Sequence, residues 1–178
     1  DVYRFRIESK AKTTNDYASI PHKFAQRCYK ETNPIIVPST SSERRDYIPV
    51  GFLEKGSVVT NSANVVYDSN LSLYSVLTSK LHNVWVRSVG GRLETRIRYS
   101  TEMCYNTFPF PFISKNKSDA ISQSVLNIID ERLKHSEKTL AELYDPDKMP
   151  DGLKEAHHQN DLAVDRCYRS TPFSSDEE

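Results

Sequence analysis

Residues 90–100 have the sequence GGRLETRIRYS, in which charged and uncharged side chains alternate. Alternation with a period of two predicts a β-strand, in which residues two apart lie on one face, about 6.6 Å from each other. We therefore expect one charged face and one apolar face. The charged face would carry Arg92, Glu94, Arg96 and Arg98, and the apolar face would carry Leu93, Ile97 and Tyr99.

The residues before this stretch predict a helix that ends at the two glycines. Between residues 71 and 88, apolar residues recur at intervals of three and four, which is the spacing of one helix face. They are Leu73, Leu77, Leu81, Val84 and Trp85. Gly90 and Gly91 follow, and glycines commonly end a helix. We expect the apolar face of the charged strand to pack on this helix.

The rest of the first 112 residues predicts short strands joined by loops. Strands rich in valine, isoleucine and aromatic residues are expected at 34–38, 47–54 and 57–68, with further ones at 23–29 and 103–108. A short helix is expected at 2–12, and loops at 13–24 and 39–46. The prolines of FPFP, residues 108–111, should end the last strand because proline cannot donate to a ladder.

The C-terminal third predicts helices. After a linker at 113–119, an apolar stripe indicates a helix at 118–135, and a turn region at 144–152 leads into a helix at 151–168. Pro150 suits the start of that last helix. The sequence thus predicts an α+β fold, with a small mixed or antiparallel sheet and a packed helix, followed by an all-α segment. The expected domains are residues 1–112 and 113–178.

The overall composition indicates a reduced, soluble setting and does not indicate a uniformly basic protein. The net charge is zero, but residues 1–112 carry 15 basic and 10 acidic side chains, whereas residues 113–178 carry 9 and 14. Three widely spaced cysteines predict neither a disulfide framework nor a metal site, so we expect a cytoplasmic protein. The chain begins at Asp1, without methionine, and we expect it to be part of a longer protein.

The charged face has two interpretations on pattern alone. Guanidinium groups are the commonest partners of guanine in the major groove, and a carboxylate can accept from the cytosine amino group. The alternative is a solvated strand face on which Glu94 bridges Arg92 or Arg96. The upstream SSERR has the residue types that bind phosphates, although it could equally be an ordinary polar loop. Those residues are Ser41, Ser42, Arg44 and Arg45.

The order of longer motifs favours the first interpretation. SSERRDYIPVGF, LTSKLHNVWVRSVGGRLETRIRYS, YNTFPFP and LAELYDPDKMPDGLKEAHHQNDLAVDRCY occur in this order along the chain. The series closely resembles the C-terminal third of MmeI-like (type IIG) restriction–modification enzymes, which are single-chain adenine methyltransferases often fused to an endonuclease. The resemblance covers residues 2–168.

The resemblance implies a target recognition domain that binds double-stranded DNA, followed by a helical segment. Family base-reading positions fall on Glu94, Arg96 and Arg98, with a further one near Ser62. It implies that Glu94 with Arg96 recognise one base pair, and Arg98 with Ser62 another. Contacts with the DNA backbone are expected from Ser41, Ser42, Arg44, Arg45, Arg87 and Arg92. S-adenosylmethionine would bind in the parent's methyltransferase domain and not in this chain.

Other candidate groups carry less functional weight. His157 and His158 diverge by about 100° on a helix, so we expect no shared metal. His82 and Asn83 could either contact DNA or support the glycine turn, and Cys104 is expected in the core. YNTFPFP lacks the paired prolines of an amino-methyltransferase catalytic loop, and no glycine-rich cofactor motif follows a strand, so we expect no catalysis by this chain alone.

Two other functions stay open at this level. The acidic helical segment could dock onto the parent's catalytic domain or onto a partner chain, which would make the chain a protein-interaction module. An RNA-binding module is a third option, although the aromatic signature of an RNA-recognition sheet is missing from the sequence.

Overall fold

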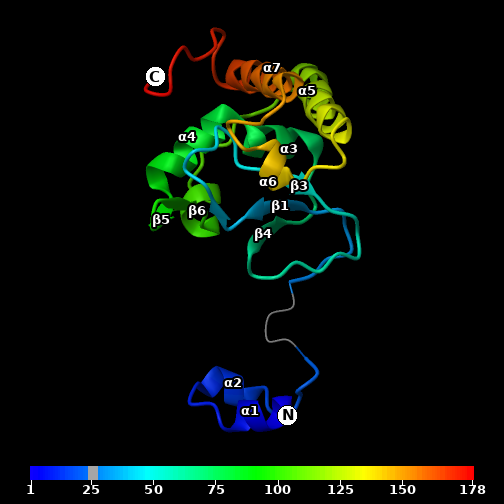
Figure 1. Cartoon of the computed structure of the whole chain (residues 1–178), viewed down its shortest axis with the longest axis vertical. Coiled ribbons are helices and arrows are strands. Elements are labelled where there is room, and N and C mark those ends of the chain that lie inside the picture. The colour runs from blue at the N-terminus through cyan, green and yellow to red at the C-terminus, as the bar shows by residue number, and fades with distance from the viewer. Residues whose placement is uncertain (24–27) are drawn as a thin grey trace. The chain divides into compact units, whose positions relative to one another are not determined.

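The computed structural model describes residues 1–23 and 28–178. They form two units, residues 1–31 and residues 32–178 (Figure 1). The strand predicted near 23–29 falls mainly on residues 24–27, which lie outside the described residues.

The first unit is a pair of short helices, α1 (Val2–Ile7) and α2 (Lys12–Asp16). The guanidinium of Arg6 organises the unit by donating to the backbone oxygens of Tyr17, at 2.8 Å, and Ile20, at 3.0 Å. Helix α1 confirms that a helix begins at Val2, but it ends at Ile7 and not at the predicted residue 12. Helix α2 lies where a loop was predicted, because five polar residues give no apolar periodicity to detect.

The second unit contains two antiparallel three-stranded sheets. In the first, β1 (Ile35–Pro38) lies between β3 (Gly51–Phe52) and β4 (Ala63–Val66). Strands were predicted in all three places, but β3 has only two residues. Pro49 lacks the N–H that a longer ladder would need, which fits this short length.

The second sheet has the order β2-β6-β5, and we call it the recognition sheet: β2 (Thr40–Ser41), β6 (Arg96–Arg98) and β5 (Gly91–Leu93). The prediction of one strand through residues 92–99 is therefore wrong, because the chain reverses at Glu94 and Thr95 to form a hairpin. The prediction of a loop throughout 39–46 is also wrong, because β2 pairs with β6.

The predicted helix at 71–88 is two helices, α3 (Leu71–Thr78) and α4 (Lys80–Val89). Ser79 is extended between them, and its hydroxyl accepts from the backbone N–H of His82, which caps α4. Helix α4 ends at Gly90 as predicted. Residues 103–108 do not pair as a strand; the π-helix η1 (Thr101–Tyr105) includes the first half of this region.

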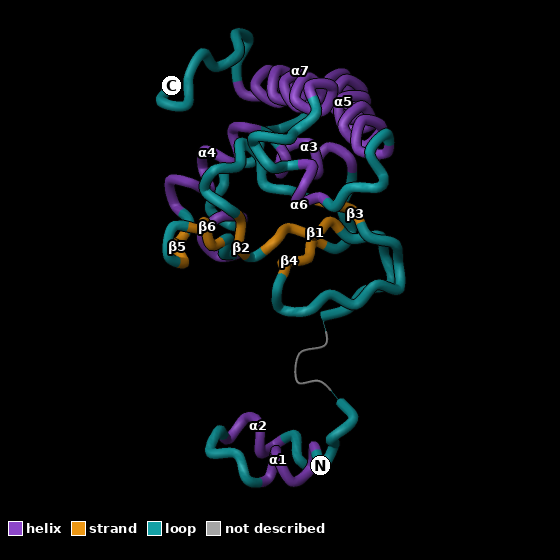
Figure 2. The backbone as a smooth tube through the Cα atoms, in the orientation of Figure 1, coloured by secondary structure: helices purple, strands orange, loops and turns teal. Residues whose placement is uncertain are grey.

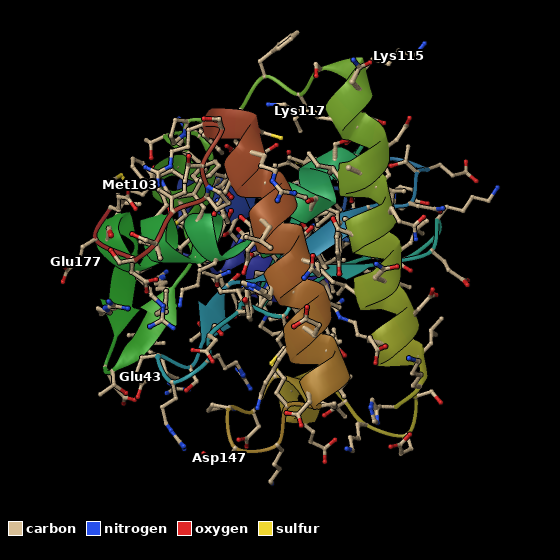
Figure 3. The ribbon with its side chains drawn as sticks, turned by 90° about the horizontal axis from the view of Figure 1, so that it is seen from above. Glu43, Met103, Lys115, Lys117, Asp147 and Glu177 are labelled. Atoms are coloured by element: carbon tan, nitrogen blue, oxygen red, sulfur yellow. The ribbon has the colours of Figure 1, made fainter. Side chains whose placement is uncertain are left out.

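Three helices follow, α5 (Lys115–Leu133), α6 (Leu140–Leu143) and α7 (Asp151–Tyr168). The predicted bounds of α7 are confirmed, whereas α5 begins earlier than predicted and takes up part of the expected linker. Helix α6 was not predicted; Thr139 and Glu142 start it with a capping box. Helices α5 and α7 lie side by side and cover α3 (Figures 2 and 3).

The main core joins both sheets to the helices, which confirms the α+β prediction. It contains Ile35, Val37, Ile48, Val50, Tyr74, Leu77, Val86, Ile97, Tyr99, Cys104 and Val125. Val125 belongs to α5, so the C-terminal helices contribute to the same core as the sheets. The apolar stripe of α5 is thus largely used within the chain, and Cys104 is buried as predicted.

Buried polar groups also fasten these helices. The Asn160 side-chain oxygen on α7 accepts from the hydroxyls of Ser75, at 2.6 Å, and Ser124, at 2.9 Å. The Arg132 guanidinium on α5 donates to the Val50 carbonyl at 2.8 Å and to the Tyr144 hydroxyl at 2.8 Å. No helix in the described part of the chain combines the length and the hydropathy needed to cross a membrane.

Candidate nucleic-acid interface

The recognition sheet presents two arginines outward from its central strand. Arg96 and Arg98 are exposed, whereas Ile97 between them is 2% exposed. These three placements agree with the alternation of the sequence. Because β6 has a neighbour on each side, its backbone is fixed by hydrogen bonds to both β2 and β5.

The hairpin changes the faces of the two residues before the turn. Arg92 pairs with Ile97, and Leu93 pairs with Arg96. Directly opposed residues of an antiparallel pair lie on the same face. Arg92 therefore shares the face of Ile97, and Leu93, which is 45% exposed, shares the face of Arg96. The predictions that Arg92 lines the arginine face and that Leu93 packs inward are wrong.

The inner side of β6 is anchored in the core. Ile97 and Tyr99 are buried, and the Tyr99 hydroxyl lies 3.1 Å from Nε2 of His82 on α4. Burial lowers the pKa of His82 to about 3, so this imidazole is neutral at physiological pH. His82 thus supports β6 rather than contacting DNA. Asn83 is also buried, and its side-chain oxygen accepts from the backbone of Ile48 at 2.8 Å.

The turn of the hairpin carries an ion pair. Glu94 Oε2 accepts from Arg96 Nη2 at 3.0 Å, and the two side chains are 76% and 52% exposed. Glu94 has φ 57°, in the left-handed region where glycine is favoured at the first residue of such a turn. A side chain in this conformation costs about 1 kcal/mol, and such strain is frequent at binding sites.

Ser62 and Arg98 are brought to one junction, at Ser39. Ser39 separates β1 from β2, and its N–H donates to the Ser62 carbonyl at 3.0 Å. Its carbonyl accepts from the Tyr99 N–H at 3.0 Å, while neighbouring Thr40 pairs with Arg98. Ser62 is exposed. Two residues 36 positions apart in sequence, one in the turn before β4 and one on β6, therefore lie next to the same residue, Ser39.

The basic loop at residues 42–46 is held by other parts of the chain. Arg87 is half-buried and donates to the carbonyls of Glu43, at 2.9 Å, and Arg45. Arg44 pairs with Asp147 at 2.7 Å, and this bond raises the pKa of the Arg44 guanidinium. Figure 3 labels Glu43 and Asp147 along the edge where the loop meets the C-terminal segment.

The residues predicted to contact the DNA backbone therefore differ in how far they are available to a ligand. Ser41 is 4% exposed, so its hydroxyl is not presented to solvent, and Arg87 uses its guanidinium to hold the loop. Ser42 accepts from the Arg44 N–H at 3.3 Å, and Arg92 donates to the Arg87 carbonyl at 3.1 Å. Arg45 donates to the Ala141 carbonyl at 3.3 Å. Their contacts with DNA stay predictions.

Of the two adjacent histidines on α7, one is structural. His157 is buried, and its Nε2 lies 2.7 Å from the Tyr144 hydroxyl, whereas His158 is exposed. Among the residues that the structure describes, no group of three or more histidine, cysteine or acidic side chains could hold a metal ion. Sequence reasoning missed Asn64 and Thr101, which bond across the junction at Ser39; no local pattern signals this contact.

Comparison with known families agrees with this arrangement. Residues 1–112 match the family described as the MmeI target recognition domain, and residues 113–178 match the MmeI C-terminal domain. The chain belongs to the MmeI target recognition domain family. The resemblance inferred from the sequence motifs is therefore confirmed.

The chain spans only part of the length of two relatives. It is 43% identical over 173 residues to DNA methyltransferase A of Bacillus subtilis (strain 168), covering 97% of this chain and 20% of that protein. It also matches the type IIL restriction–modification enzyme MmeI, solved in complex with DNA, with a TM-score of 0.94 and 38% identity. That match covers 99% of this chain and 24% of the other.

Proposed function

We propose that this chain is the sequence-recognising module of a larger adenine-specific DNA methyltransferase, and that it binds the major groove of double-stranded DNA. The observation that carries the proposal is the recognition sheet, whose central strand presents Arg96 and Arg98 outward while Ile97 and Tyr99 fix it to the core. A rigid strand suits this role because hydrogen bonding to base edges tolerates little displacement.

One base pair is assigned to Glu94 and Arg96. In the free chain Glu94 holds the Arg96 guanidinium, which leaves other N–H groups of Arg96 for a base. Arg96 would donate to guanine, and Glu94 would orient it or accept from cytosine. The strained backbone of Glu94 supports a functional reason for keeping a glutamate in a turn where glycine is favoured.

A second base pair is assigned to Arg98 and Ser62, because Ser62 bonds to Ser39 and Arg98 pairs with the neighbouring Thr40. Contacts with phosphates are assigned to the exposed Arg44 and, more weakly, to Ser42, Arg45 and Arg92. We assign no phosphate contact to Ser41 or Arg87, because the first is buried and the second holds the basic loop.

The other functions of the parent protein belong to the part outside this chain. S-adenosylmethionine would bind in the parent's methyltransferase domain, and this chain would contribute recognition through residues 1–112 and helical support through residues 113–178. The whole protein would act on DNA in the cytoplasm. Cleavage of DNA by the parent does not follow from any residue of this chain.

We also propose that the first unit docks on the parent's methyltransferase domain. Four large apolar side chains of α1 are exposed: Val2, Tyr3, Phe5 and Ile7. DNA methyltransferase A is about five times as long as this chain and MmeI about four times, and a parent of such a length would have further surface to cover these side chains. In the full-length protein, Phe5→Ser should increase proteolytic cleavage within residues 1–31, with Lys12→Ser as the exposed polar control.

The test of base recognition uses the full-length protein. Arg96→Ala should cost about 1–3 kcal/mol of binding free energy and relax one base pair of the methylated sequence. Arg92→Ala is the matched comparison, since Arg92 lies on the opposite face and is assigned to a phosphate, so that its loss should weaken binding without relaxing any base pair. For both variants, the methylated sequence is determined by sequencing methylated adenines genome-wide. Methylation of an unchanged sequence at an unchanged rate by the Arg96 variant would refute the proposal.

A further inference from the structure

A chain of polar side chains crosses the junction where Ser62 and Arg98 meet. Thr101 Oγ1 donates to Asn64 Oδ1 at 3.1 Å, and Asn64 Nδ2 donates to Ser39 Oγ at 3.5 Å. Ser39 Oγ in turn donates to the carbonyl of Asn61, also at 3.5 Å. We call these side chains the Thr101–Asn64–Ser39 chain. It connects the segment after β6 to the loop that carries Ser62.

The two ends of this chain lie beside the proposed base contacts. Thr101 follows β6 by three residues, and Asn61 precedes Ser62 directly. In between, Asn64 belongs to β4 of the first sheet, whereas Arg98 belongs to the recognition sheet. The Thr101–Asn64–Ser39 chain therefore links β4 of the first sheet to η1, the segment that follows β6, in addition to the backbone bonds of Ser39.

The core does not require this chain. Thr101 and Asn61 are exposed, Asn64 and Ser39 are only partly buried, and two of the three hydrogen bonds are at the long limit of 3.5 Å. Solvent-accessible bonds of this kind add little to global stability, because water can replace either partner. What they restrict is the position of the Ser62 loop relative to the end of β6.

We propose that Thr101 and Asn64 are positioning residues that hold Ser62 and Arg98 in register, so that both face the same base pair. The inference rests on the proposed function. It adds a specific consequence, because the Glu94–Arg96 pair lies at the hairpin turn, at the other end of β6, and has no bond to the Thr101–Asn64–Ser39 chain. Loss of the Thr101 hydroxyl should thus disturb recognition at one base pair only.

The experiment compares two substitutions at residue 101 in the full-length methyltransferase. Thr101→Val keeps the shape of the side chain but removes the donor, whereas Thr101→Ser keeps the donor. Arg98→Ala identifies the base pair that Arg98 recognises. For each variant, sequencing of methylated adenines gives the ratio of methylation at the target sequence to methylation at every single-base variant of it.

Thr101→Val should reduce discrimination about 3- to 10-fold at the base pair relaxed by Arg98→Ala, the range expected for one hydrogen bond, and should leave the others within about 2-fold. Thr101→Ser should restore discrimination. Equal loss at all base pairs, no loss at any, or a Thr101→Ser variant that behaves like Thr101→Val would each overturn the inference. If Arg98→Ala relaxes no base pair, the proposed function itself fails, and this inference fails with it.

Discussion

In the helical layer of α3, α5 and α7, polar side chains bond to one another inside the protein, whereas the arginines of the recognition sheet are exposed. Asn160 and Arg132 each satisfy groups from other segments inside the protein. Arg96 and Arg98 instead leave most of their donors to solvent, with Glu94 as the one recorded side-chain partner in the described structure.

This difference separates the polar groups that specify the fold from those available to a ligand. Removing one partner of a buried hydrogen bond leaves the other unsatisfied, which costs stability. Removing an exposed arginine leaves no such penalty, so its loss should be detected in binding alone. The two regions should therefore respond oppositely to substitution in assays of stability and of DNA recognition.

The largest effect is expected for Arg132→Met. This substitution removes the hydrogen bonds that Arg132 donates to the Tyr144 hydroxyl and to the Val50 carbonyl, so unfolding free energy should fall by about 3 kcal/mol. Urea denaturation measures the change. Arg166→Met is the control on α7, where an exposed arginine should change stability by less than about 0.5 kcal/mol. If unfolding free energy fell by a similarly small amount in both variants, the hydrogen bonds of Arg132 would not stabilise the layer of α3, α5 and α7.

The pH dependence of stability should be next in size. Burial lowers the pKa of His82 and His157 to about 3, below the ordinary 6.5, so the stability they provide is present above pH 6.5 and is lost as pH falls. Burial raises the pKa of Asp161 to about 6, above its ordinary 3.8. Its contribution therefore has the opposite sign, being present below pH 3.8 and lost as pH rises through 6.

Between pH 6 and 4, two histidines thus oppose one aspartate, and the net loss from these three groups is about 1.4 kcal/mol per pH unit. Asp161→Asn removes the opposing group and should roughly double this slope. Because other carboxylates titrate in the same range, the informative quantity is the difference in slope between the two proteins, from urea denaturation at several pH values. Parallel pH profiles would contradict the assignment of Asp161.

In the recognition sheet, Arg98→Ala should leave unfolding free energy within about 0.5 kcal/mol of the parent value and cost about 1–3 kcal/mol in discrimination at one base pair. Urea denaturation and competition binding with single-base variants of the target measure the two quantities in the full-length protein. A large loss of stability without a change in discrimination would show that Arg98, like Arg87 and Arg132, holds the fold and does not recognise a base.

The smallest effect is expected for Glu94→Gly. Glycine adopts φ 57° without the cost that a side chain carries, so unfolding free energy should rise by about 0.5–1 kcal/mol. Discrimination at the base pair assigned to Glu94 and Arg96 should fall. Thermal unfolding and methylation mapping test the two parts, and Glu94→Gln, which keeps the strain but removes the charge, separates them.

Elements with strong periodicity were predictable from sequence. The apolar stripe and Pro150 gave the bounds of α7, and alternation placed Ile97 inward and Arg96 and Arg98 outward. The hairpin turn was not predictable, because Glu94 and Thr95 are not the glycine or asparagine that mark such turns. That one missed reversal accounts for the wrong faces of Arg92 and Leu93.

The sequence by itself determined the α+β character, the family, and the arginines of β6 as candidate base contacts, since these depend on local periodicity and on motif order. Only the tertiary structure decided which residues share a surface. Asn64 bonds to Thr101, and Arg87 turns inward to hold a loop, because such contacts and burial depend on residues far apart in the chain. Such contacts leave no pattern in the sequence around either partner.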